Sequence, residues 1–150
     1  MIANQRQDMG QPGHDVPILI VMYERNLATV AEKICEMEGY PVETAHNGED
    51  ALRALVAAER GHIVLVDTWY AILEGATELA GYLEDRTRRA PHRLVVMSAI
   101  TNIEWQRRTM QADTMVVLPF SVAELIETIE RVKRAMSAAP EAPPEFTIDV

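Results

Sequence analysis

Five short apolar segments of this chain each end in residues that could line a site. The five ends are Met22-Tyr23-Glu24, Ala45-His46, Asp67-Thr68, Ser98-Ala99 and Leu118-Pro119. Glu24 and Asp67 supply the only carboxylates among them, and carboxylates are the side chains that a hard cation such as Mg²⁺ prefers. Asp67 follows the apolar run Ile63–Val66 directly, so it could belong to a site or simply cap the loop that follows.

The elements that must position these ends alternate between two patterns. Short apolar runs, several of them β-branched, predict strands, and apolar residues spaced three and four apart predict helices. The expected strands are Ile18–Met22, Pro41–Ala45, Ile63–Asp67, Leu94–Ser98 and Met115–Leu118. The expected helices are Asn26–Glu38, a helix capped by Asn47, Ala76–Arg88, a helix from Thr101 through Met110 and a helix from Ser121 onward.

The boundaries of these helices carry their own signals. Thr101 with Glu104, and Ser121 with Glu124, have the spacing of capping boxes. Gly39 is a typical residue at which a helix stops. The first helix should turn Leu27, Val30, Ala31, Ile34 and Met37 inward, and the last should turn Val122, Leu125, Ile126, Ile129 and Val132 inward.

Five alternating strand–helix units predict an α/β fold. Strands that are apolar on both faces indicate a parallel sheet covered by helices on both sides. A flavodoxin-like, doubly wound domain with a five-stranded parallel sheet satisfies this pattern with short connections, and its sites lie beyond the carboxyl ends of the strands. We expect this domain to span residues 17–136, between disordered tails at 1–16 and 137–150, the second rich in Pro, Ala and Glu.

Composition excludes several classes of protein. The chain of 150 residues has 14 basic and 23 acidic residues and a net charge of −9, which argues against broad binding to nucleic acid or to an anionic membrane. A single cysteine, Cys35, excludes an internal disulfide framework and a cysteine-based zinc site, and a structural thiol is the simpler interpretation. We expect no signal peptide, no membrane span and a cytoplasmic location.

The pattern resembles a response-regulator receiver domain of two-component signalling, from about Pro17 to Met136. The residues that carry the resemblance are Ile18-Leu19-Ile20-Val21, Glu38-Gly39-Tyr40, Thr44-Ala45-His46-Asn47-Gly48-Glu49, Ala51-Leu52, Val64-Leu65-Val66-Asp67, Glu74-Gly75, Val95-Val96-Met97-Ser98-Ala99 and Pro119-Phe120. Each is weak alone, but their order and spacing together are specific.

The resemblance implies roles for two residues and exposes several departures. Asp67 falls on the aspartate that accepts a phosphoryl group, and Ser98 falls on the residue that contacts that group and repositions during activation. The acidic pair that holds Mg²⁺ in such domains is here Met22-Tyr23, with Glu24 one residue later. The lysine before Pro-Phe is Leu118, the aromatic switch residue is Met115, and the usual Met-Pro after the acceptor is Tyr70-Ala71.

These departures predict impaired phosphorylation. A thioether is a poor ligand for a hard cation, and a phosphoaspartate at Asp67 would lack the lysine charge that Leu118 replaces. Met22, Tyr23 and Leu118 are then expected to fill a disused acidic pocket, with no cofactor and Mg²⁺ bound weakly if at all. The expected function is an atypical, non-enzymatic receiver that binds another signalling protein; the alternative is a working phosphorelay receiver phosphorylated on Asp67 by a histidine kinase.

Two surfaces are candidates for contact with a partner. The resemblance places the partner surface around Trp105, Met115 and Val117, and the partner could be a histidine kinase, another signalling protein or a second copy of the chain. A second group of residues, Arg86, Arg88, Arg89, His92 and Arg93, predicts a basic patch, either a solvated surface or a contact for an acidic partner. No Gly-rich phosphate loop follows the first strand, and the four histidines lack metal-ligand spacing, which disfavours a nucleotide, flavin or metal enzyme.

Overall fold

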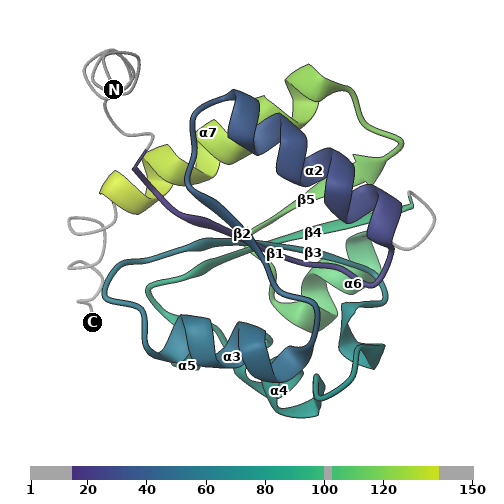
Figure 1. Ribbon diagram of the computed structural model, residues 1–150, viewed down its shortest axis with the longest axis vertical. Coiled ribbons are helices and arrows are strands. Elements are labelled where there is room, and N and C mark those ends of the chain that lie inside the picture. The colour runs from purple at the N-terminus through teal and green to yellow at the C-terminus, as the bar shows by residue number, and fades with distance from the viewer. Residues whose placement is uncertain (1–14, 100–102, 139–150) are drawn as a thin grey trace, which may run out of the picture.

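A five-stranded parallel sheet forms the centre of the molecule. The computed structural model of the chain describes residues 15–99 and 103–138 (Figure 1). The strands are β1 (Ile18–Val21), β2 (Val42–Thr44), β3 (Ile63–Asp67), β4 (Arg93–Ala99) and β5 (Thr114–Leu118), and they lie in the order β2-β1-β3-β4-β5. This confirms the predicted flavodoxin-like fold, and it brings all five strand ends to one edge of the sheet.

Helices cover both faces of the sheet, as Figure 1 shows. α2 (Arg25–Met37) and α7 (Val122–Ala138) lie on one face. The other face carries α3 (Gly48–Val56), α4 (Thr77–Leu83), α5 (Arg86–Arg89) and α6 (Ile103–Met110), and the short 3₁₀ helix η1 (Tyr70–Ile72) follows β3. Every residue of β1 and β3 is buried, because both strands lie inside the sheet and between the two helical layers.

Most predicted helix boundaries are confirmed by the contacts that make them. The Asn47 side chain accepts a hydrogen bond from the Asp50 amide at 2.8 Å and so caps α3. The capping box of α7 is complete, because Glu124 N–H donates to Ser121 Oγ and Ser121 N–H donates to Glu124 Oε1. Gly39 has φ of 92° just after α2, a conformation that favours glycine. Thr101, half of the other predicted box, lies outside the described residues.

Three details of the predicted elements are wrong. The expected helix Ala76–Arg88 is two helices, because the Asp85 side chain accepts from the Thr87 and Arg88 amides and starts a new helix. α7 continues through Ala138, so the domain extends beyond residue 136. The buried stripe of α2 also differs, with Ala28, Ala31, Ile34 and Cys35 inside. Val30, Met37 and, at the start of α7, Val122 are exposed, because their positions lie outside the arc of each helix that faces the sheet.

The predicted basic patch is also wrong in part, because two of its residues are buried. The Arg89 guanidinium donates to Leu83 O at 2.6 Å, to Gln111 O at 2.7 Å and to Asp113 Oδ2 at 3.0 Å. The same Asp113 oxygen accepts from the Leu94 amide at 2.7 Å. Removing one partner of such a buried pair typically costs about 3–5 kcal/mol, so Arg89 and Asp113 fix α5 to the start of β4.

His92, the other buried member of the predicted patch, is held as a neutral ring. Its Nδ1 accepts a hydrogen bond from the His62 amide at 2.9 Å, and its Nε2 lies 3.0 Å from Leu55 O. Since Nδ1 accepts, the ring proton must sit on Nε2, where it can be donated to the carbonyl. The pKa of His92 lies below its usual 6.5, chiefly because the ring is buried. The hydrogen bond to the Leu55 carbonyl raises the pKa, and the nearby His62 lowers it.

The lowered pKa of His92 predicts a loss of stability in mild acid. The unfolded chain binds the proton more readily than the folded one, so the stabilising contribution is complete above about pH 6.5 and falls as pH decreases below it. The free energy of unfolding from urea titrations should therefore decrease between pH 7.5 and pH 5.5. The variant His92→Gln, whose amide can donate near the position of Nε2 but does not titrate, should show a flatter profile; an equally steep profile would exclude His92 as the cause.

Candidate functional site

The candidate site lies at the edge of the sheet where the strands end, and Asp67 is at its centre. Asp67 is the last residue of β3 and its side chain is only 3% exposed. The carboxylate accepts two backbone hydrogen bonds, from Tyr23 N–H to Oδ1 at 3.2 Å and from Glu24 N–H to Oδ2 at 2.9 Å. Both oxygens of the predicted acceptor therefore bond to the turn between β1 and α2.

The local sequence explains why these two amides are available. β1 ends at Val21 and α2 begins at Arg25, with Glu24 in an extended conformation at the N-cap position and no side-chain cap. The N–H groups at the start of a helix have no partner within the helix, and the helix dipole favours a negative charge there. The Asp67 carboxylate meets both requirements from the neighbouring strand, and its own burial is balanced by the same bonds.

The three residues that replace the usual acidic cluster lie in different environments. Met22 is buried and packs in the core between the sheet and α2. Tyr23 is 50% exposed, so the expectation that its ring fills the disused pocket is wrong. The turn directs the backbone of Tyr23 toward Asp67 and leaves its side chain outside. Glu24 is exposed, and its contact with Asp67 is made by its backbone amide.

The hydroxyl expected to contact a phosphoryl group has another partner. Ser98 is buried near the end of β4, and its Oγ accepts a hydrogen bond from Thr68 Oγ1 at 2.9 Å. Thr68 directly follows Asp67, so Ser98 is next to the predicted acceptor. Tyr70, at the place of the usual Met, is buried and donates to Glu84 Oε2 at 2.9 Å, and burial together with the Glu84 charge raises the pKa of its hydroxyl far above normal.

The remaining predicted positions belong to β5 and α6. Leu118 is half-buried and packs against the core on the α2 and α7 side. Met115 and Val117 are half-buried and pack against the core on the opposite side. The side chain of Trp105, the proposed anchor of the partner surface, lies outside the described part of the structure. Cys35 is buried, and burial, followed by the charges of Glu36 and Glu38, raises the pKa of its thiol to about 12.

The described residues at this edge offer a single buried carboxylate to a cation such as Mg²⁺. A hard cation in near-octahedral geometry prefers oxygen ligands, usually including one or two carboxylates. Asp67 is one carboxylate, and each of its oxygens already accepts an amide hydrogen bond, while Met22 offers a buried thioether. Among residues 15–99 and 103–138, no group of three His, Cys, Asp or Glu side chains is placed to hold a metal ion.

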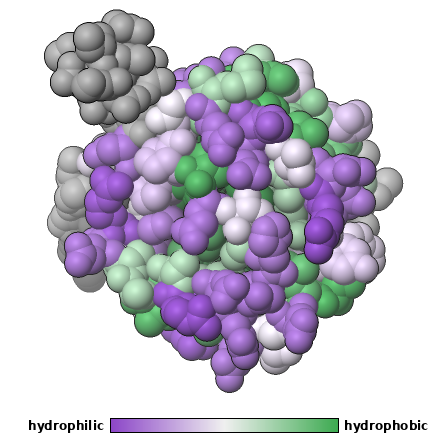
Figure 2. Space-filling view, viewed as in Figure 1, coloured by the Kyte–Doolittle hydropathy of each residue, from purple (hydrophilic) through white to green (hydrophobic). Residues whose placement is uncertain are grey.

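An apolar groove beside the site was not predicted. It has a volume of about 550 Å³ between α2 and the start of α7, and its lining residues are Asn26, Leu27, Val30, Ile34, Leu118, Pro119, Phe120 and Val122. Val30 is 49% exposed and Val122 is 55% exposed. Figure 2 shows a largely hydrophilic face on which hydrophobic residues gather near the region where α7 begins. A helix pattern alone could not distinguish these valines from core residues.

Comparison with solved structures identifies this architecture. The chain is similar to NtrX from Brucella abortus, with 23% identity, a TM-score of 0.68 and coverage of 85% of this chain and 28% of that chain. It is also similar to a streptococcal redox sensor evolved from two-component response regulators, with 20% identity, a TM-score of 0.67 and coverage of 83% and 54%. It matches the response regulator TrrA from Thermotoga maritima with 26% identity, a TM-score of 0.62 and coverage of 78% and 98%.

These likenesses establish the fold. The chain has the receiver-domain fold of response regulators, the CheY-like fold, as its sequence resemblance implied. It spans about a quarter of the Brucella protein and about half of the streptococcal one. No protein-family model matches the sequence, and a comparison with curated proteins finds no match. In the described residues, no helix is both long enough and apolar enough to cross a membrane.

The amide contacts of Asp67 predict how the domain responds to Asp67→Asn. An asparagine can accept only one of the two bonds, so either the Tyr23 or the Glu24 amide would face a donor. Leaving one such group without a partner typically costs about 1–3 kcal/mol, and we expect a loss in this range in the free energy of unfolding. Glu59→Gln, at an exposed position outside the helices, is the matched control and should change stability little. An increase in stability for Asp67→Asn would instead indicate a carboxylate repelled by its neighbours.

Proposed function

We propose that this chain is an atypical receiver domain that signals by binding another protein, and that its phosphorylation on Asp67 is impaired. The observation that carries the proposal is the pair of hydrogen bonds from the Tyr23 and Glu24 amides to the Asp67 carboxylate. Phosphoryl transfer to a carboxylate depends on positioning and on positive charge around the transferred group. Around Asp67, the usual acidic pair is replaced by Met22 and Tyr23, and the usual lysine is replaced by Leu118.

The burial of Asp67 supports this proposal. A carboxylate that is 3% exposed, with both oxygens bonded to a neighbouring turn, is poorly placed to approach a phosphoryl donor. Transfer to either oxygen would displace or crowd the Tyr23 or Glu24 amide. The product would carry close to two negative charges in surroundings where Met22 is apolar and Leu118 takes the place of a lysine. Such a product would lack the charge stabilisation that this reaction normally requires.

The surface of the domain supports a role in protein binding. The apolar groove between α2 and α7 adjoins the candidate site, and groups of exposed hydrophobic residues often mark interaction surfaces. Trp69 and Ile72, which follow Asp67, are also exposed. The similarity to a streptococcal redox sensor evolved from response regulators offers a precedent in which this fold serves a different signal.

A second candidate function is a working phosphorelay receiver. Asp67 lies at the end of β3. Thr68, the next residue, donates a hydrogen bond of 2.9 Å to the Ser98 hydroxyl. Asp67 and Ser98 preserve the acceptor and hydroxyl positions that a phosphorelay needs. Glu24 is exposed next to Asp67 and is the carboxylate that could enlarge a metal site if the turn rearranged. In this alternative the Tyr23 and Glu24 amides must release Asp67 before transfer.

Direct phosphorylation separates the two candidates. With acetyl phosphate and about 10 mM Mg²⁺, a concentration that fills an ordinary weak Mg²⁺ site, intact-mass spectrometry should show no added phosphoryl group. The variant Met22→Asp/Tyr23→Asp/Leu118→Lys restores the missing ligands and charge, and it should gain one phosphoryl group. Its Asp67→Asn derivative should not. Stoichiometric phosphorylation of the unmodified chain on Asp67 would reject the first candidate and support the second.

Partner binding should be independent of the acceptor but dependent on the α6 and β5 face. Once a partner is captured from the native cell and purified, we expect Trp105→Ala to weaken the complex by about 2 kcal/mol, the scale of an interface hot spot. Asp67→Asn should leave the affinity almost unchanged at a temperature at which it is folded. The control Val56→Ala alters an exposed residue of α3, away from that face. Loss of binding in Asp67→Asn with retention in Trp105→Ala would contradict the proposed mechanism.

A further inference from the structure

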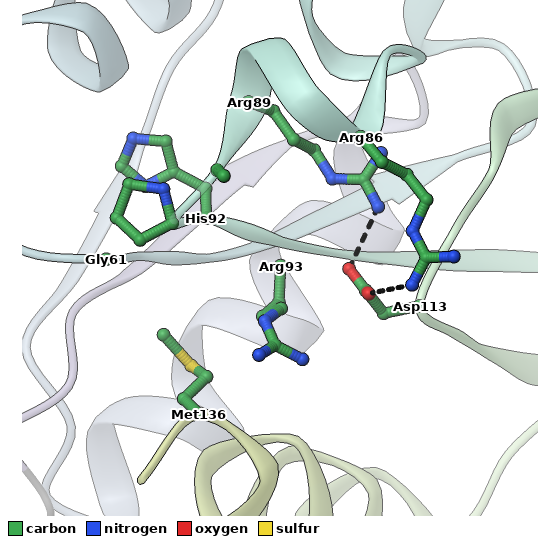
Figure 3. Close-up of a pocket in the computed structure, with 9 residues that line it drawn as sticks. Gly61, Arg86, Arg89, His92, Arg93, Asp113 and Met136 are labelled. Atoms are coloured by element: carbon green, nitrogen blue, oxygen red, sulfur yellow. Dashed lines mark hydrogen bonds and ion pairs between the residues drawn. The ribbon is translucent and has the colours of Figure 1, made fainter. Parts of the chain in front are cut away.

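A cavity of about 500 Å³ opens at the edge of the sheet opposite Asp67. Its lining residues are Gly61, Arg86, Arg89, Ala90, Pro91, His92, Arg93, Asp113 and Met136 (Figure 3). Arg93 pairs with Ile63 at the start of the strands, and Met97 pairs with Asp67 four residues later. At about 3.3 Å per residue, the cavity therefore lies roughly 13 Å along the sheet from the candidate site. None of the proposed receiver chemistry uses it.

One side of the cavity is fixed by the buried ion pair already described. Arg89 is fully buried, and its guanidinium contacts Asp113 and two carbonyl groups. Arg86, whose side chain is mostly exposed, approaches Asp113 Oδ1 at 3.4 Å, a long and weak contact. Asp113 thus orients both arginines, as Figure 3 shows, and most of the hydrogen-bonding capacity of Arg86 remains available.

Arg93 is the side chain that the fold leaves unexplained. It is half-buried, and its guanidinium makes no hydrogen bond or ion pair with any described residue. In Figure 3 it projects into the cavity between Met136 and the Arg86–Asp113 pair. A partly desolvated cation without a partner is unfavourable, and an anion bound in the cavity would compensate it.

The charge of the cavity favours an anion. Three arginines and one aspartate line it, while His92 is held neutral, so the lining has an excess of two positive charges. This excess is notable because the whole chain carries a net charge of −9. The guanidinium group presents planar, paired donors that match the oxygens of a phosphate better than a lysine does.

The rest of the lining favours an organic ligand. Pro91 and Met136 provide apolar walls next to the arginines. At Gly61 a Cβ atom would lie 2.9 Å from Pro91 O and 3.0 Å from Met136 Cε, so the absence of a side chain there leaves these walls in place. The volume is within the range of about 300–1,000 Å³ that is common for small-molecule sites.

We propose that this cavity binds a small organic phosphate monoester. The phosphate group lies between the guanidinium groups of Arg93 and Arg86, and the organic part packs against Pro91 and Met136. Arg89 is a positioning residue, since its contacts with Asp113 hold Arg86 at the rim. The site is independent of Asp67 and would give the domain a small-molecule input at the edge opposite the candidate site.

The test measures binding of defined probes to the full chain. Glucose 6-phosphate and adenosine 5′-monophosphate are titrated while amide chemical shifts are recorded by NMR. At least one ester should bind with a dissociation constant of about 0.5 mM or lower, the range expected for ligands of this size, and should shift the amides of Gly61 and Arg93. Glucose and adenosine should not bind, and inorganic phosphate should bind at least tenfold more weakly than the better ester.

Matched variants locate the site. Arg93→Gln should weaken binding at least tenfold, and Arg93→Lys should recover part of the loss because it keeps the charge without the planar donors. Arg53→Gln removes the same charge from the surface of α3 and should change affinity less than twofold, and Asp67→Asn should have no effect. Absence of binding by both esters at 10 mM, or equal losses in Arg53→Gln and Arg93→Gln, would overturn the proposal, as would inorganic phosphate that binds as tightly as the esters.

Discussion

The Asp67 carboxylate and the two amides it accepts connect the central strand of the sheet to the first helix. A buried carboxylate needs hydrogen-bond donors, and the start of α2 needs an acceptor because Glu24 provides no side-chain cap. The two amides supply the donors that the carboxylate needs, and the carboxylate supplies the acceptor that the amides need. The result is a direct contact between β3 and the β1–α2 turn, at the place where the sequence resemblance implies an acidic cluster in other receiver domains. The access of a phosphoryl donor to Asp67 depends on this contact.

At the opposite edge of the sheet the buried charged group is a cation, and it too needs hydrogen-bond partners. Arg89 is buried, and its guanidinium is compensated by two carbonyl groups and Asp113. At this edge the positive charge is not fully compensated. The Arg93 guanidinium projects into a cavity and has no partner among the described residues. The Asp67 carboxylate at one edge has its hydrogen bonds within the protein, whereas the Arg93 guanidinium at the other edge can bind the proposed ligand. This contrast distinguishes the two ends of the domain.

The sequence predicted the order of elements well because each depends on local signals. The apolar run Ile63–Val66 is short and rich in β-branched residues, which predicts a buried strand. The Ser121 and Glu124 pair marks a helix start through contacts within four residues. Asp67 and Ser98 lie near the ends of β3 and β4, where the apolar runs before them predicted the strands to end, and the ends of parallel strands share one edge. The sequence did not predict the break between α4 and α5. Asp85 lies in an otherwise helical pattern, and its role as an N-cap is visible only from the hydrogen bonds that its side chain accepts from backbone amides.

The amino-acid sequence by itself determined the class of fold, the position of Asp67 and the absence of the usual ligands around it, because residue type and periodicity are local properties. The tertiary structure decided what surrounds each side chain. Only folding brings the Tyr23 and Glu24 amides to Asp67, across 44 and 43 residues of sequence respectively, and only folding buries Arg89 while leaving Arg93 at a cavity. Backbone donors have no signature in residue type, and the burial of a charge depends on contacts between distant segments.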